Sequence, residues 1–156
     1  MGDIIMFKLF RKKKVSEPVK CDICVKDMQF EEGYLLYSDE VTTNQAYWDY
    51  AFRHQWSYLH DIDAEGNTML SLVDRMFNQK YAWLVCGDCI ELFSSQYKRM
   101  REPRMKEAMK SPDPRKYTPH VLLSGRDRRM GAARYNAAKV WMKLYGKPPK
   151  SLEEYI

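Results

Sequence analysis

Short apolar runs bounded by polar residues predict three strands along the chain. They lie at Tyr34–Tyr37, Tyr81–Val85 and His120–Leu123, and each has the length and hydrophobicity of a buried strand. The stretches between and beyond these runs carry a helical rather than an alternating period. The pattern therefore predicts a chain in which short strands are interleaved with helices.

Aromatic residues between the first two strands follow a helical period. Val41–Asn44 supplies residues that cap helix N-termini, and we expect a helix of about four turns from there to near His60. Trp48, Phe52 and Trp56 lie four residues apart, which gives this helix an apolar face. Large rings dominate core packing, so we interpret the face as core rather than as a platform for stacking bases.

Two further helices are predicted before residue 111. The first runs from about Thr68 to Gln79, and the second begins at the cysteine pair near residue 86. Four apolar residues follow that pair at helical spacing: Ile90, Phe93, Tyr97 and Met100. Pro103 should break or kink this helix, and Ser111–Pro114 marks a stop and the best candidate linker.

A last long helix is predicted from Arg126 to Tyr145. Gly146 stands where helices commonly end in a left-handed residue, and Pro148 follows just beyond it. The apolar stripe consists of Met130, Ala133, Ala137, Val140, Trp141 and Leu144. The basic positions are Arg126, Arg128, Arg129, Arg134, Lys139 and Lys143. The helix is therefore expected to be amphipathic and basic.

Charge divides the chain more sharply than its net value of +5 indicates. Residues 1–20 carry a net charge of +4, residues 21–97 carry −9 and residues 98–150 carry +12. An acidic middle and a basic final third indicate two surfaces with different functions, or one surface that neutralises the other. Composition is ordinary for a globular protein, and no apolar run is long enough for a transmembrane segment.

All four cysteines fall in two C-x-x-C pairs. Such a turn points two thiolates at one metal, and two turns complete a tetrahedral shell with no open position. The expected ligands are Cys21, Cys24, Cys86 and Cys89, which would hold one structural Zn²⁺ ion. The 61 residues between the pairs must then form a folded insertion.

The surroundings of the two pairs resemble a known type of zinc site. Cys21–Gly33 and Tyr81–Tyr97 resemble a treble-clef zinc finger, in which a knuckle and a β-hairpin precede a helix that supplies the last ligands. They are similar in particular to the zinc-binding domain at the start of the ClpX unfoldase, where a second C-x-x-C opens a helix. The resemblance implies the type of finger. The long insertion departs from that family, so no partner or oligomeric state is carried over.

The expected fold class is α+β, with a treble-clef-like zinc module, a helical insertion between the knuckles and a basic helical C-terminal extension. We expect a basic N-terminal arm at residues 1–20 and a zinc-binding domain at 21–110. The helical insertion would occupy about 39–80, and the basic extension 111–156.

Two enzymatic interpretations compete for the same residues. Cys86–Cys89 after a strand is similar to a thioredoxin-type redox site, with Thr118–Pro119 as its proline, but this leaves the first cysteine pair without a role. A metal-dependent nuclease built on a treble clef would use His54 or His60, although the usual Asp-His pair is absent. Surface or capping roles are the simpler expectation for both histidines.

The sequence thus predicts a non-enzymatic, zinc-stabilised binding or adaptor protein that acts through contacts with an unidentified protein. The alternative is a nucleic-acid-binding protein whose Arg-rich last helix follows phosphates. A thiol redox enzyme or a nuclease is the third interpretation. Cysteines used as metal ligands, with no visible secretory signal, lead us to expect a cytoplasmic location.

Overall fold

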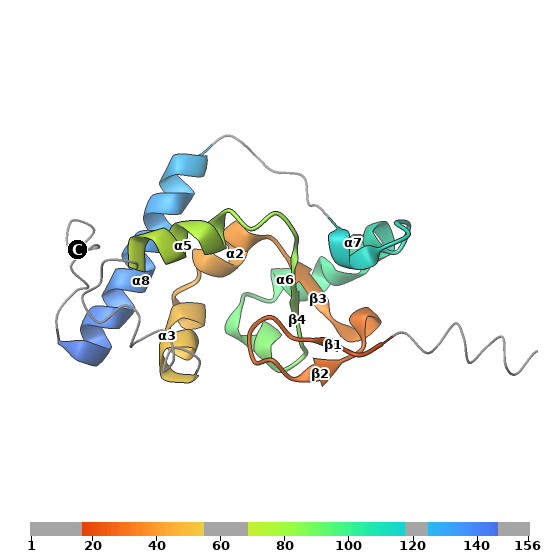
Figure 1. Cartoon of the computed structure of the whole chain (residues 1–156), viewed down its shortest axis with the longest axis horizontal. Coiled ribbons are helices and arrows are strands. Elements are labelled where there is room, and N and C mark those ends of the chain that lie inside the picture. Colours follow the sequence, from red (N-terminus) through yellow and green to blue (C-terminus); the bar gives the residue numbers. More distant parts are fainter. Residues whose placement is uncertain (1–16, 55–68, 118–124, 147–156) are drawn as a thin grey trace, which may run out of the picture.

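The computed structural model describes residues 17–54, 69–117 and 125–146, which are drawn in colour in Figure 1. The strands are β1 (Val19–Lys20), β2 (Asp27–Met28), β3 (Tyr34–Leu36) and β4 (Trp83–Val85). The α-helices are α2 (Ser38–Thr42), α3 (Gln45–His54), α5 (Met69–Phe77), α6 (Gln96–Arg99), α7 (Arg101–Ala108) and α8 (Arg126–Tyr145). Three 3₁₀ helices complete the set: η1 (Phe30–Glu32), η2 (Cys89–Leu92) and η3 (Pro114–Lys116). The predicted α+β class is confirmed.

The strands form two small antiparallel sheets. β1 pairs with β2, and β3 pairs with β4 with Tyr34 opposite Val85 and Leu36 opposite Trp83. The predicted strands in the segments 34–37 and 81–85 are therefore confirmed. The third predicted strand, His120–Leu123, lies outside the described residues.

The helical segment after β3 begins earlier than the sequence predicts. α2 precedes α3, and the Glu40 side chain accepts a hydrogen bond from the Tyr37 N–H at 2.7 Å. α3 begins where the sequence places it, because the Asn44 side chain accepts the Tyr47 N–H at 3.2 Å. Trp48 on α3 is fully buried, as expected of a core residue. The rest of the predicted helix, from 55 to 60, lies outside the described residues.

The predicted continuous helix after the second cysteine pair is wrong. A four-residue 3₁₀ helix, η2, forms instead, and Phe93 then adopts an extended backbone with φ −111° and ψ 167°. This conformation leaves the Phe93 ring buried, and the next two residues, Ser94 and Ser95, are weak helix formers. The predicted break near Pro103 is found, because the helix is interrupted at Met100, between α6 and α7. Pro103 itself is the third residue of α7, where a missing N–H costs no hydrogen bond within that helix.

α8 has the predicted bounds and termination. Gly146 has φ 82°, and its N–H donates to the Met142 carbonyl at 2.8 Å. Ala133, Ala137, Val140 and Trp141 of the predicted stripe are buried, and Met130 and Leu144 are half-buried against the core. The predicted apolar stripe is therefore confirmed.

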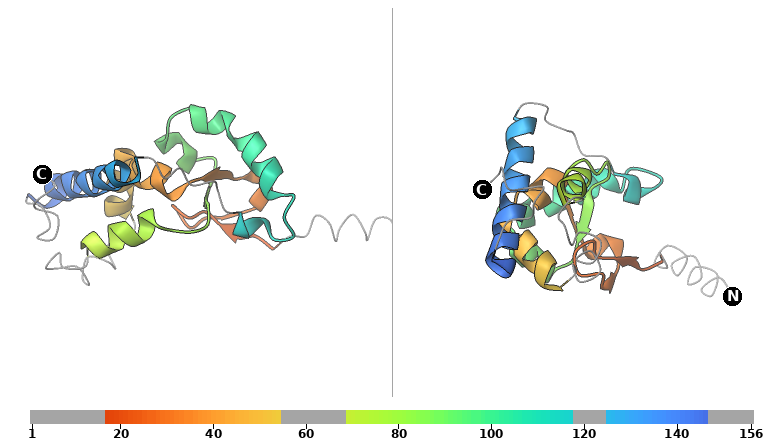
Figure 2. Two further views of the ribbon diagram at one scale, coloured as in Figure 1. Left: turned by 90° about the horizontal axis from the view of Figure 1, so that it is seen from above. Right: turned by 60° about the vertical axis from the view of Figure 1, so that its left-hand side comes forward.

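The elements form two regions that lie side by side (Figure 1). The sheet region contains both sheets with α6 and α7, and the helical region contains α2, α3, α5 and α8. α8 lies at the edge of the molecule and packs on α2, α3 and α5, which occupy the predicted insertion (Figure 2). No helix in the described part of the chain combines the length and the hydrophobicity needed to cross a membrane.

Candidate metal centre

Each cysteine pair is positioned by a tight backbone turn next to a strand. In the first turn, between β1 and β2, the Cys21 N–H donates to the Lys26 carbonyl at 2.9 Å and the Val25 N–H donates to the Cys21 carbonyl at 3.0 Å. Val25 has φ 66°, a left-handed conformation that is unusual for a β-branched residue. The second pair follows β4 directly, and the Ile90 N–H donates to the Cys86 carbonyl at 3.0 Å. The β3–β4 pairing therefore sets the position of the second pair.

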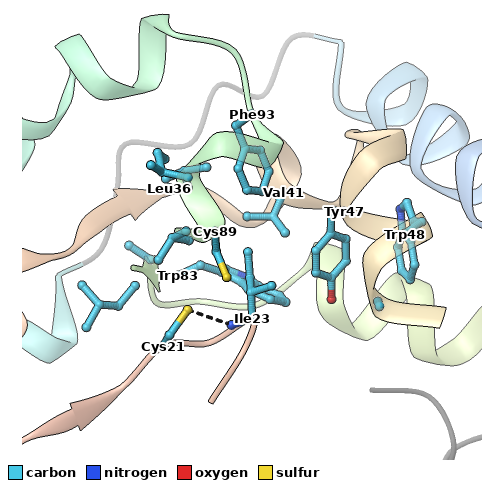
Figure 3. Close-up of a cluster of buried hydrophobic side chains, with 14 of the residues drawn as sticks. Cys21, Ile23, Leu36, Val41, Tyr47, Trp48, Trp83, Cys89 and Phe93 are labelled. Carbon is cyan, nitrogen blue, oxygen red and sulfur yellow. Dashed lines mark hydrogen bonds between the residues drawn. The ribbon is translucent and has the colours of Figure 1, made fainter. Parts of the chain in front are cut away.

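The structure brings all four predicted ligands together. The sulfur atoms of Cys21, Cys24, Cys86 and Cys89 all lie within 4.8 Å of one another, and the Cys24 and Cys86 sulfurs are 3.7 Å apart. In a tetrahedral shell with metal–sulfur bonds of about 2.3 Å, sulfurs are about 3.8 Å apart. All four thiols are free, and Figure 3 shows Cys21 and Cys89 pointing toward one another within the buried cluster. The four cysteines could therefore hold one metal ion.

Backbone amides also point at the sulfurs. The Cys21 sulfur accepts hydrogen bonds from the Ile23 N–H at 3.4 Å and from the Cys86 N–H at 3.3 Å. The Cys86 sulfur accepts the Cys89 N–H at 3.4 Å. Such donors stabilise the thiolate, which is the form that binds metal.

The pKa values of three of the cysteine thiols are shifted in different directions. A hydrogen bond from the Cys89 thiol, with help from backbone amides and against the effect of burial, lowers the pKa of Cys21 to about 4. The same hydrogen bond raises the pKa of Cys89, and burial raises the pKa of Cys24. A cation entering this cluster would favour the thiolate forms and displace the remaining protons.

Two contacts that the sequence analysis missed hold the turns against each other. The Asp22 N–H donates to the Leu84 carbonyl at 2.9 Å, and the Asp22 carboxylate accepts the Leu84 N–H at 2.7 Å. The Lys26 ammonium lies 3.1 Å from the Asp88 carboxylate. The sequence shows an aspartate inside each C-x-x-C, but it does not identify the residue that each aspartate contacts.

The donor set fits a closed structural site. Three of the sulfur-bearing residues, Cys21, Cys86 and Cys89, are buried, and Cys24 is half-buried. Within the described ranges this is the one cluster of three or more metal-ligating side chains. His54 lies outside it, exposed at the end of α3 with its ring 4.5 Å from the Tyr50 ring, and His60 lies outside the described residues. Four soft ligands fill a tetrahedron and leave no position for substrate.

The predicted basic residues of α8 divide into two groups. Arg134 forms two hydrogen bonds to the Asp74 carboxylate at 2.8 and 2.6 Å, and Arg129 lies 3.1 Å from the Asp39 carboxylate. Arg126 donates to the Asn78 side chain and lies over the Phe77 ring. The other three residues are exposed: Arg128, Lys139 and Lys143. Half of the predicted binding set therefore contacts residues outside α8, and Lys139 lies over the Tyr135 ring of the same helix, 5.9 Å from its centroid.

The described residues thus define an α+β module with one four-cysteine metal-binding centre. No family model, curated protein or solved structure matches this chain.

Proposed function

We propose that this protein is a non-enzymatic adaptor whose fold is stabilised by one Zn²⁺ ion and which acts through contacts with another protein. The observation that carries the proposal is the closed cluster of four sulfurs within 4.8 Å, three of them on buried residues. Thiolates favour zinc among the common divalent metals, and a complete protein shell is typical of structural rather than catalytic sites.

The treble-clef type of finger is the finer part of this proposal. A β-hairpin that carries the first pair and a strand that leads into the second pair support it. The short η2 in place of a full helix, and the helical insertion, are departures from that pattern. These departures leave the partner and the assembly to be established for this chain itself.

The charge pattern supports a protein partner over nucleic acid. Arg129 and Arg134 contact carboxylates of the acidic middle segment, so α8 presents fewer cations outward than its sequence indicates. A phosphate-binding helix would keep such residues exposed. A salt titration with labelled DNA and RNA tests the alternative. Sub-micromolar binding that falls steeply with salt would favour nucleic acid and contradict the adaptor proposal.

The enzymatic alternatives have less support. A thioredoxin-type site requires a central sheet with parallel strands, whereas both sheets of the described residues are two-stranded and antiparallel. The proline required by that interpretation, Pro119, lies outside the described residues. A nuclease would need a histidine at its metal. Among the described residues His54 is not part of the cluster, and His60 lies outside the described residues.

The test is the Cys86→Ser variant of the full chain, compared with the wild type before and after zinc removal. We expect Cys86→Ser to lower the free energy of unfolding by about 3 kcal/mol or more under reducing conditions, and to abolish stoichiometric zinc. Co²⁺ in the wild type should give the visible spectrum of a tetrahedral thiolate site.

Ala137→Ser is a matched control because it places a hydroxyl at a buried position of α8, away from the cysteines. Its loss of stability should be the same with and without zinc. A Cys86→Ser protein that keeps wild-type stability and loses thiol exchange alone would contradict the proposal and favour a redox enzyme.

A further inference from the structure

The outward side of α8 carries two large, partly exposed apolar residues, and Lys139 of the same helix lies over the ring of one of them, 5.9 Å from the Tyr135 centroid. Tyr135 and Met142 are 45% and 37% exposed, although both are large and apolar. They lie seven residues apart, which is two helical turns, so they share one face about 10.5 Å apart. Arg128 lies seven residues before Tyr135 on the same line. This face is opposite the buried stripe that includes Ala133 and Ala137.

A glycine lies on the same face. Gly131 stands one turn before Tyr135 in the interior of α8, where glycine disfavours the helix. A methyl group added at Gly131 would meet no described atom within 4 Å, so packing within the described part of the chain gives no steric reason for glycine there. Close approach of another backbone would give one.

The charge of this face is positive. Arg128, Lys139 and Lys143 are exposed, and among the described residues no carboxylate lies within ion-pair distance of them. The inward arginines of α8 are engaged by Asp39 and Asp74, so the outward positive charge is concentrated beside Tyr135 and Met142. Figures 1 and 2 place α8 at the edge of the molecule, with the other helices on its inner side.

We propose that this outer face of α8 is the docking surface for an acidic amphipathic helix of a partner protein. The inference rests on the proposed adaptor function and specifies its surface and the chemistry of its partner. A partner helix places apolar residues at the same seven-residue interval, and its carboxylates would lie opposite Arg128 and Lys139. Gly131 would let the two helix axes approach closely.

The exposed apolar line favours a protein over nucleic acid as the occupant. A phosphate backbone gains nothing from Met142. Arg128 extends the line of Tyr135 and Met142, and Lys139 and Lys143 lie beside it. A helix with an apolar stripe and acidic flanks satisfies both kinds of residue at once.

The test uses the zinc-loaded full chain and a fluorescent model peptide of about 20 residues, with leucine at the heptad a and d positions and glutamate at the others. The same peptide with lysine in place of glutamate is the comparison. We expect the acidic peptide to bind at least about ten-fold more tightly than the basic one. Met142→Asp should weaken its binding about ten-fold, and Arg128→Glu should remove the preference for acid.

Gly131→Leu gives a second variant that does not disturb the buried stripe. It should preserve or raise the Tm by a few degrees, because leucine favours helix, and should still weaken peptide binding about ten-fold. The matched control is Met109→Asp at the end of α7, where a methionine that is 45% exposed, against 37% for Met142, lies outside α8. This control should bind the peptide as the wild type does.

Three results would overturn the inference. They are equal binding of the two peptides, peptide binding that Met142→Asp leaves unchanged, and binding of a DNA duplex that depends on Arg128 but not on Met142. None of these results bears on zinc, because the Cys86→Ser experiment measures the metal dependence of folding separately. The docking surface and the zinc-stabilised fold can therefore fail independently.

Discussion

The sheet region has strands of two or three residues, whereas the helical region is built around a twenty-residue helix. Two-stranded sheets this short are marginal on their own. The helical region instead buries large rings, with the Phe52 and Trp141 centroids 5.6 Å apart in an edge-on arrangement. A bound metal should therefore stabilise the sheet region most, because that region has the least regular structure, whereas α8 should depend on side-chain packing.

Metal removal should produce the largest difference between the two regions. We expect a chelator to lower the free energy of unfolding by several kcal/mol, and β3 and β4 to lose amide protection before the buried turns of α8. Hydrogen exchange followed by mass spectrometry checks this order. Simultaneous loss of protection in both regions would show that they form one cooperative unit.

The second prediction tests side-chain packing in the helical region with the variant Trp141→Ala. Trp141 is buried against Phe52, so its truncation should cost about 3–5 kcal/mol in urea unfolding. The cost should be similar with and without zinc. Tyr81→Ala, at a residue that is 47% exposed, is the control and should cost less than about 0.5 kcal/mol.

Glu40 on α2 and Arg104 on α7 link the regions. The Arg104 guanidinium forms two hydrogen bonds to the Glu40 carboxylate at 2.7 and 2.9 Å, a third to the Leu35 carbonyl at 2.8 Å, and lies over the Tyr37 ring. Glu40→Ala should cost about 3 kcal/mol, because it leaves a buried cation without its partner.

With zinc bound, the two regions of the wild type should unfold together in urea, so tryptophan fluorescence and metal release should have the same midpoint. In Glu40→Ala the two midpoints should differ. The double change Glu40→Leu with Arg104→Met should recover much of the stability. If it recovers none, the charge is not the reason for the loss.

The smallest effect is expected at the surface of the helical region. Arg134 and Asp74 are partly exposed, with side chains 22% and 29% accessible, so Arg134→Met should cost about 0.5–1 kcal/mol. The cost should shrink in high salt, which screens the pair. Thermal unfolding at two salt concentrations measures it, and Arg128→Met should have no comparable salt-dependent effect.

Local patterns predict some parts of this molecule well. The bounds of α8 follow from an apolar stripe of period 3.6 and a glycine at its end, and both are properties of the helix itself. The four-cysteine cluster follows from two C-x-x-C turns, because each turn fixes two sulfurs locally.

Other features of the fold depend on tertiary contacts between residues that are far apart in the sequence. The sequence indicates that Arg129 and Arg134 are basic, but the fold decides that Asp39 and Asp74 face them. The break at Phe93 similarly results from burial of its ring, which overrides the helical spacing of Ile90, Phe93 and Tyr97. Asp22 acquires its role from Leu84, 62 positions further along the chain.

The separation of the two cysteine pairs has a consequence for how the protein is made. A growing chain exposes Cys24 early, but Cys86 is synthesised 62 positions later. The four-sulfur cluster cannot close until the second cysteine pair has been synthesised, and closure of so long a loop carries an entropic cost. We therefore expect α2, α3 and α5, which lie between the two cysteine pairs, to be synthesised before the four cysteines can capture a metal ion.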